Sequence, residues 1–113
     1  MIEKEKLIKI IKDWFKSKGG GGLVTPDGWF GRPHDNVHML TYLEVRPNKV
    51  ILELDEQLYL IFTNLKSVYT KDNELCFEEF SQCVFDWQGY GDLKPNASLF
   101  RAGTIKIVAP TGP

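Results

Sequence analysis

The stretch HMLTYLEVRPNKVILELDEQLYLIF, residues 38–62, decides the fold. Apolar and polar residues alternate along it, which is the period of a β-strand and not of a helix. Pro47-Asn48 and Asp55-Glu56-Gln57 interrupt the alternation with residue types that favour turns. We therefore predict three consecutive antiparallel strands, separated by these two turns.

The same alternation predicts which side chains share a face. In the first strand, Met39, Leu43 and Val45 fall on one face, and Leu40 and Tyr42 fall on the other. The two strands that follow are apolar on nearly both faces, which is typical of strands that are covered on both sides. We therefore expect both faces of this part of the sheet to be covered.

Strand-like segments continue toward the C-terminus at intervals of about 8–12 residues, a spacing that indicates an antiparallel sheet or a small barrel. A loop rich in turn residues separates the last segment from the others. The predicted segments are 68–69, 75–78, 82–87 and 98–108.

The first residues of the chain predict an amphipathic helix over 2–18. Leu7, Ile10, Ile11 and Trp14 are spaced i, i+3, i+4 and i+7, which places them on one helical face. Four glycines, 19–22, follow directly. Such a run belongs neither in a helix nor in a packed sheet, so we expect it to act as a hinge.

Together these patterns predict one domain of the α+β class. Its N-terminal amphipathic helix packs on a curved antiparallel sheet or small β-barrel of about 6–8 short strands in meander order. The domain divides into the helix (2–18), the glycine hinge (19–22), a β body (23–109) and a tail (110–113).

Composition excludes several classes of protein. The 113 residues are 42% hydrophobic and 26% charged, as in an ordinary soluble domain. The net charge of −1 lacks the basic field that attracts nucleic acid, so we expect no nucleic-acid partner. We find no transmembrane stretch, secretory signal or cofactor motif, and we therefore predict a cytoplasmic protein without a cofactor.

The two cysteines give little functional information. Cys76 and Cys83 lack the spacing of a metal knuckle or of a redox motif. They could face each other across a hairpin and form a disulfide, but in a reducing cytosol we interpret them as two small buried hydrophobes.

Charge is distributed unevenly along the chain. Residues 1–18 carry six lysines against three acids, whereas residues 72–92 carry six acids and neither lysine nor arginine. This polarity could dock a basic partner on the sheet, and an acidic partner or a membrane surface on the helix. Alternatively, it keeps each face solvated, or the helix docks on the acidic region of its own domain.

The segment 28–38, GWFGRPHDNVH, contains most of the candidate binding residues. It combines aromatic rings, an arginine fork for carboxylate or phosphate, and two titratable histidines on a loop, where function commonly resides. The loop 88–95 is a second candidate contact surface. The candidates are Trp29, Phe30, Arg32, His34, Asp35, His38, Tyr90 and Asp92.

Two functional hypotheses remain open. The first is a non-catalytic module that binds a protein or a small ligand through the 23–38 and 88–95 loops, with Trp29, Phe30, Arg32 and Tyr90 as anchors. The second is a small hydrolase in which His34 or His38 acts as base beside Asp35 or Asp92. We favour the first, because no nucleophile has a visible activating motif. A homodimer is a further open alternative.

Two further interpretations compete with these hypotheses. In a purely structural one, Trp29 and Phe30 plug one end of the barrel and Arg32 pairs with a surface carboxylate. In a metal-site interpretation, His34 and His38 bind a divalent ion with Asp35 beside them. A zinc site needs three or four converging ligands, so we predict no metal.

Overall fold

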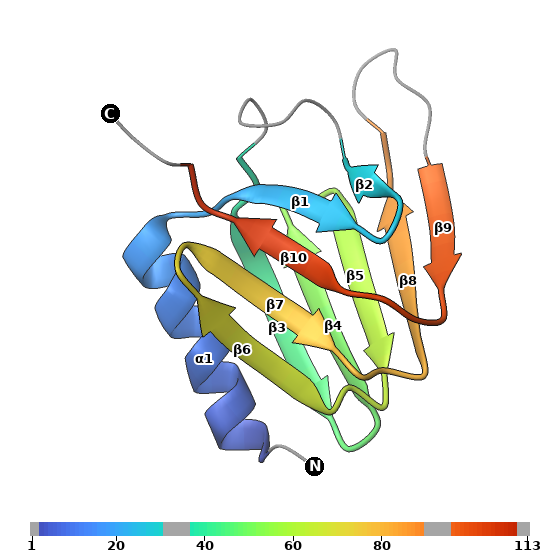
Figure 1. Cartoon of the computed structure of the whole chain (residues 1–113), viewed down its shortest axis with the longest axis horizontal. Helices are drawn as coiled ribbons and strands as arrows, with labels where there is room; N and C mark the ends of the chain where they lie inside the picture. The colour runs from blue at the N-terminus through green and yellow to red at the C-terminus, as the bar shows by residue number, and fades with distance from the viewer. Residues whose placement is uncertain (1–2, 31–36, 90–95, 111–113) are drawn as a thin grey trace.

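Figure 1 shows the computed structural model of the chain, which describes residues 3–30, 37–89 and 96–110. One helix is followed by strands that run antiparallel to their neighbours. The elements are α1 (Lys4–Lys18), β1 (Gly22–Thr25), β2 (Gly28–Trp29), β3 (Leu40–Arg46), β4 (Lys49–Leu54), β5 (Leu58–Thr63), β6 (Ser67–Lys71), β7 (Glu74–Glu78), β8 (Gln82–Trp87), β9 (Asn96–Phe100) and β10 (Ile105–Val108).

The strands form two five-stranded sheets that lie face to face (Figure 1). The order of the first sheet is β2-β1-β10-β7-β6, and that of the second sheet is β3-β4-β5-β8-β9. The α+β class with antiparallel pairing is confirmed. The ten strands in the described residues exceed the expected 6–8, and the meander order breaks where the β6–β7 hairpin joins the first sheet.

The predicted helix is confirmed, and its apolar stripe explains its position. Leu7, Ile11 and Trp14 are all buried, and α1 lies against β3 of the second sheet and β6 of the first. The helix therefore closes one open side of the sandwich (Figure 1). It ends at Gly19, whose φ of 79° allows its N–H to donate to the Phe15 carbonyl.

One hydrophobic core joins the helix to both sheets. Phe62 of the second sheet stacks on Phe77 of the first, with ring centroids 4.9 Å apart, and both rings are fully buried. Phe80 packs edge-on against Phe62. No helix in the described residues is long and apolar enough to cross a membrane.

The expectation that four glycines cannot pack in a sheet is wrong for two of them. Gly22 begins β1, and Gly21 forms an antiparallel bridge with His38. In that bridge each backbone N–H donates to the other residue's carbonyl, at 3.1 and 2.8 Å. Whether the run also acts as a hinge is a separate prediction about motion.

The face assignment in the first predicted strand is also wrong at its start. The pairing of β3 with β4 shifts between Leu40 and Tyr42, so Thr41 forms an irregularity of the bulge type. As a result Leu40 packs against the core with Leu43, while Met39 is 56% exposed. The bulge also turns His38 into the protein.

The single strand expected over 98–108 is instead two strands in different sheets. β9 belongs to the second sheet and β10 to the first. The chain bends between them at Gly103, which has a φ of 105°. A left-handed backbone there requires glycine, which is the reason for the break.

Candidate functional site

The structure describes three of the residues that the sequence singled out, Trp29, Phe30 and His38. The candidate site is therefore built from these three and from the neighbours that the fold brings to them. The other candidates lie outside the described residues: Arg32, His34, Asp35, Tyr90 and Asp92.

Trp29 and Phe30 line a cavity of about 170 Å³ on the side of the sandwich away from α1. We call it the β2–β9 cleft, because it lies between β2 and β9, the edge strands of the two sheets. Figure 1 shows these strands across the sandwich from the helix. Its lining residues are Thr25, Asp27, Gly28, Trp29, Phe30, Phe85, Ser98 and Phe100.

The aromatic floor of the cleft is held by packing. The Phe30 ring lies 4.9 Å from the ring of Phe85 and 5.3 Å from that of Trp87, both in edge-on geometry. Phe30 therefore packs against the core. Trp29 differs, because it remains 39% exposed at the mouth of the cleft.

A tight turn fixes the polar rim of the cleft. The Thr25 hydroxyl donates to the Gly28 carbonyl at 3.1 Å and accepts from the Asp27 N–H at 3.2 Å. Gly28 has a φ of 120°, which glycine alone adopts readily. The Thr25 hydroxyl is engaged in the turn. Asp27 and Ser98 are the other polar side chains that line the cleft.

His38 is buried, and its side-chain partner is Asp55, a residue that the sequence analysis did not single out. Its Nδ1 is 2.6 Å from Oδ2 of Asp55, and the His38 ring lies 5.9 Å from Phe30. Asp55 is held in turn by Met39, whose N–H donates to Oδ1 and whose carbonyl accepts the Asp55 N–H. The carboxylate therefore fixes one orientation of the imidazole.

The glycine run makes room for this histidine. A Cβ on Gly20 would lie 2.4 Å from the carbonyl oxygen of His38, and one on Gly21 would lie 2.5 Å from that of Val108. Real side chains do not approach backbone oxygens so closely, so only glycine fits at these two positions. The run thus seats His38 against the first sheet.

The second ring nitrogen of His38, Nε2, is buried and makes no hydrogen bond within the described residues. An imidazole oriented by a carboxylate at one nitrogen is the arrangement of a general base or of a metal ligand at the other. The described residues contain no group of three or more histidine, cysteine, aspartate or glutamate side chains that could hold a metal.

The cysteines do not face each other across a hairpin, because Cys76 lies on β7 of the first sheet and Cys83 on β8 of the second. Both are free and buried. Burial raises the pKa of both thiols, that of Cys83 to about 12. Such thiols stay protonated at neutral pH and are poor nucleophiles.

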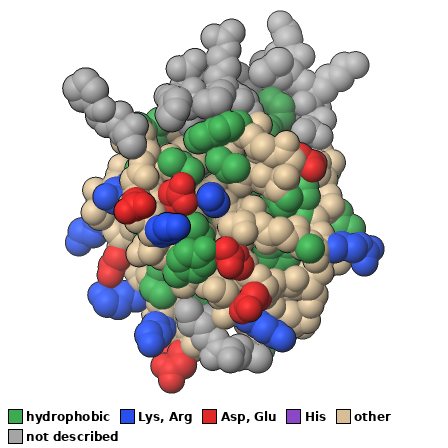
Figure 2. All heavy atoms as spheres, viewed as in Figure 1, with side chains coloured by type: hydrophobic (Ala, Val, Ile, Leu, Met, Phe, Trp, Pro, Cys, Tyr) green, Lys and Arg blue, Asp and Glu red, His purple; other side chains and the backbone are tan. Residues whose placement is uncertain are grey.

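Two acids of the acidic segment 72–92 have partners within the first sheet. Lys106 lies 3.5 Å from Glu74, and the Tyr69 hydroxyl donates to Glu78 at 2.6 Å. Figure 2 views this outer face, where acidic and basic side chains lie side by side. Lys18 of the helix and Asp72 line one cavity, so the helix lies next to the start of the acidic segment.

Comparison of the chain with protein-family models, with curated proteins and with solved structures finds no match.

Proposed function

We propose that the protein is a non-catalytic binding module, and that its β2–β9 cleft receives one apolar or aromatic group of a protein or small ligand. The observation that carries the proposal is the cleft itself, in which an exposed tryptophan borders a floor of packed aromatic rings. Clefts that combine aromatic walls with a few placed polar groups, here Asp27 and Ser98, are a common form of binding site.

The size of the cleft favours a side chain over a larger ligand. Sites for drug-sized molecules measure about 300–1,000 Å³, whereas the cleft measures about 170 Å³. A single leucine or aromatic side chain needs a space of that order. The cleft therefore fits an anchor residue of a partner protein, of the kind that dominates binding energy at interfaces.

Preorganisation supports the same proposal. The turn at Thr25 and the ring contacts of Phe30 fix the walls of the cleft before a partner arrives, so binding costs little ordering of the protein. Residues 25 and 27–30, from the first of the two segments proposed from the sequence, line the cleft, and so does β9, which follows the second segment along the chain. We keep the cytoplasm as the proposed location.

The proposal is tested by selecting peptides from a random display library on the wild-type protein. We expect the selected peptides to share one large apolar residue. Replacement by alanine at Trp29 should weaken their binding at least about tenfold, as at an interface hot spot. Ser98→Leu, which fills the cleft, should weaken it as well.

Tyr69→Ala is the matched control, because Tyr69 is an aromatic residue of similar exposure (37%) on the outer face of the first sheet. Its peptide affinities should equal those of the wild type. Peptides that bind the Trp29→Ala and Ser98→Leu variants as tightly as the wild type would contradict the proposal.

A small hydrolase is the second candidate function, and the His38–Asp55 pair favours it. The pair supplies an oriented base with Asp55 as its carboxylate, whereas the carboxylates expected from the sequence, Asp35 and Asp92, lie outside the described residues. The test is turnover of p-nitrophenyl acetate by the wild type and by His38→Asn. Turnover that the substitution removes would support the enzyme, and equal background rates would support the binding module.

A further inference from the structure

The outer face of the second sheet carries its side chains in three rows that run across the strands. Inward-facing residues of these strands, such as Leu52 and Leu60, are fully buried, so the alternate residues point outward. Strand register defines a central row of Glu44, Ile51, Ile61, Val84 and Leu99. On one side lies a basic row of Arg46, Lys49, Thr63 and Gln82, and on the other an acidic row of Tyr42, Glu53, Tyr59, Asp86 and Ala97.

Four residues of the central row, on β4, β5, β8 and β9, form an apolar strip that the described residues leave partly exposed. The fifth, Glu44 on the edge strand β3, accepts from the Tyr42 hydroxyl and pairs with Arg46. Ile51, Ile61 and Val84 are cross-strand neighbours at intermediate exposure, and Leu99 is 48% exposed. The sequence predicts that both faces of these strands are covered, and the described residues of one chain do not fully cover this face. A continuous apolar surface of this kind marks an interaction site.

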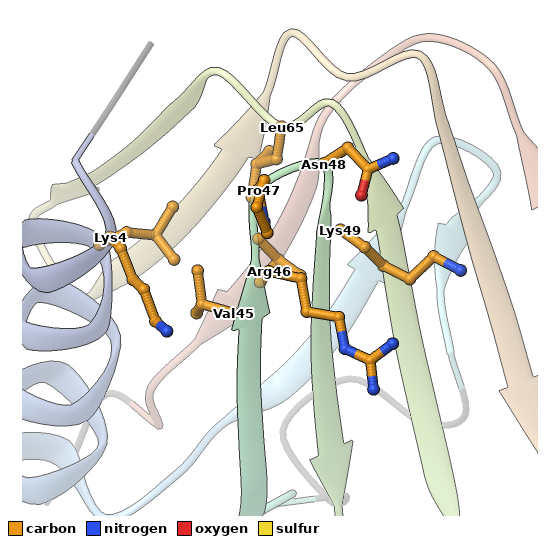
Figure 3. Close-up of a pocket in the computed structure, with 9 residues that line it drawn as sticks. Lys4, Val45, Arg46, Pro47, Asn48, Lys49 and Leu65 are labelled. Carbon is orange, nitrogen blue, oxygen red and sulfur yellow. The ribbon is translucent and has the colours of Figure 1, made fainter.

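The two flanking rows carry opposite charge. Figure 3 shows the side chains of Arg46 and Lys49, at the β3–β4 hairpin, directed away from α1, while Lys4 of α1 lines the same pocket from the helix. Arg46 pairs with Glu44, while Lys49 makes no ion pair within the described residues. In the acidic row, the charge of Glu53 raises the pKa of the Tyr59 hydroxyl.

These rows are complementary to themselves. A twofold axis along the central row brings that row against its own copy and brings each basic row against the partner's acidic row. Glu44 at the end of the central row then faces the partner's Glu44, and its charge is balanced within its own chain by Arg46. On β4, Lys49 and Glu53 lie two residues to either side of Ile51. Lys49 of one copy therefore faces Glu53 of the other copy, and this contact occurs twice. On β3, Arg46 likewise faces the ring of Tyr42, a cation–π pairing. On β8, Gln82 faces Asp86.

We propose that the outer face of the second sheet joins two copies of this chain in a face-to-face dimer with a twofold axis along the central row. Isologous twofold interfaces are the commonest in homo-oligomers, and they require such self-complementarity. The proposal does not rest on the β2–β9 cleft, whose lining residues Phe85 and Ser98 lie on the inward side of the same sheet.

The opposite face of the sandwich lacks this pattern. On the first sheet, Glu74 pairs with Lys106 and Glu78 accepts from the Tyr69 hydroxyl. Basic and acidic side chains lie close together on this face (Figure 2). Glu74 and Glu78 are therefore held within one chain, whereas Lys49 of the second sheet makes no ion pair among the described residues. The alternation of basic, apolar and acidic rows favours the second sheet as the dimer face.

The area of the face indicates a weak dimer. Strands about 4.8 Å apart and a rise of about 3.4 Å per residue give a five-stranded face of roughly 24 by 17 Å. Two such faces bury about 1,000 Å² once side-chain relief is included, which is near the lower limit for a specific interface. We therefore expect a dissociation constant of about 10–100 µM.

Sedimentation equilibrium of the full chain tests the proposal. The wild type should change from monomer to dimer over that concentration range. Lys49→Glu and Glu53→Lys should each weaken dimerisation at least about tenfold, because each places like charges opposite each other twice. An equimolar mixture of the two variants should dimerise more tightly than either alone, because every contact in the mixed dimer is again complementary.

Lys71→Glu reverses an exposed charge on β6 of the first sheet and is the matched control, which should dimerise like the wild type. Circular dichroism shows whether each variant keeps its fold. A monomer up to about 1 mM overturns the proposal. So does a dimer that ignores both charge reversals, because it would use another surface or another axis.

Discussion

At the residue scale, Gly20 and Gly21 determine where the helix joins the sheets. Their absent side chains allow the backbone of His38 and that of Val108 to approach within contact distance. Gly19, by contrast, needs glycine only for its backbone conformation, because a Cβ there meets nothing within 4 Å. The four glycines are therefore not equivalent.

This difference predicts unequal effects of alanine. Gly21→Ala should lower the free energy of unfolding by about 3 kcal/mol, because the new Cβ overlaps a fixed carbonyl group. Gly19→Ala should lower it by about 1 kcal/mol, the strain of a left-handed alanine. Urea denaturation measures both. Equal effects would mean that the run is loosely packed and that Gly21 has room to move.

Cys83 gives a second prediction, on pH dependence. Burial raises the pKa of its thiol to about 12 in the folded protein, whereas an unfolded thiol titrates near about 8.5. Between these values the folded state holds a proton that the unfolded state has lost, so stability falls as pH rises. The thiol should thus lower the free energy of unfolding by about 1.4 kcal/mol for each pH unit above about pH 9.

The measurement is the urea midpoint at pH 8 and at pH 10, for the wild type and for Cys83→Ala. Tyrosines and lysines titrate in both proteins, so the difference between the two pH dependences isolates the thiol. The variant should be less stable at pH 8 and lose less stability on going to pH 10. Equal losses in the two proteins would show that Cys83 ionises in the folded state as it does in the unfolded state.

The environment of His38 could not be predicted from the sequence. Regular alternation places His38 and Leu40 on the same face as Tyr42, which is exposed. The bulge at Thr41 shifts the alternation by one residue, so that His38 points inward and meets Asp55. Bulges depend on pairing with another strand, and a single strand's sequence does not reveal them.

At the scale of elements, the helix was predictable because its pattern is local. Leu7, Ile11 and Trp14 define one face by spacing alone, and that face is the buried one. The strands were predictable as strands for the same reason, and the β3–β4–β5 meander follows from short turns between neighbours. The helix, the strands and this meander could therefore be predicted from local sequence patterns alone.

Assignment of strands to sheets is not a local property. β6 and β7 read like the next hairpin of a meander, yet they join β10 in the first sheet, while β8 pairs back with β5. The pairing depends on which buried faces meet across the core, as Phe62 and Phe77 do. The β2–β9 cleft was unpredictable for this reason, although Trp29 and Phe30 were identified from the sequence as candidates.

At the scale of the whole molecule, the two open sides of the sandwich differ. The helix fills one, between β3 and β6, and the β2–β9 cleft lies on the other. A small two-layer domain must cover the edges of its core, and here the helix covers one edge while the other carries the cleft. The helix is consequently part of the core, since Ile11 is completely buried among residues of both sheets.

This packing predicts that the helix and the sheets unfold together, despite the glycine run between them. In a variant with Trp29→Phe and Trp87→Phe, Trp14 is the remaining tryptophan, and its fluorescence reports undocking of the helix. Its urea transition should coincide with the loss of β-sheet signal in circular dichroism of the same variant, as two-state unfolding requires. Trp14 fluorescence that changes at lower urea would show that the helix leaves first and that the glycines act as a hinge. Coincident transitions would instead establish one cooperative unit, whose stability depends on the fit of Gly20 and Gly21.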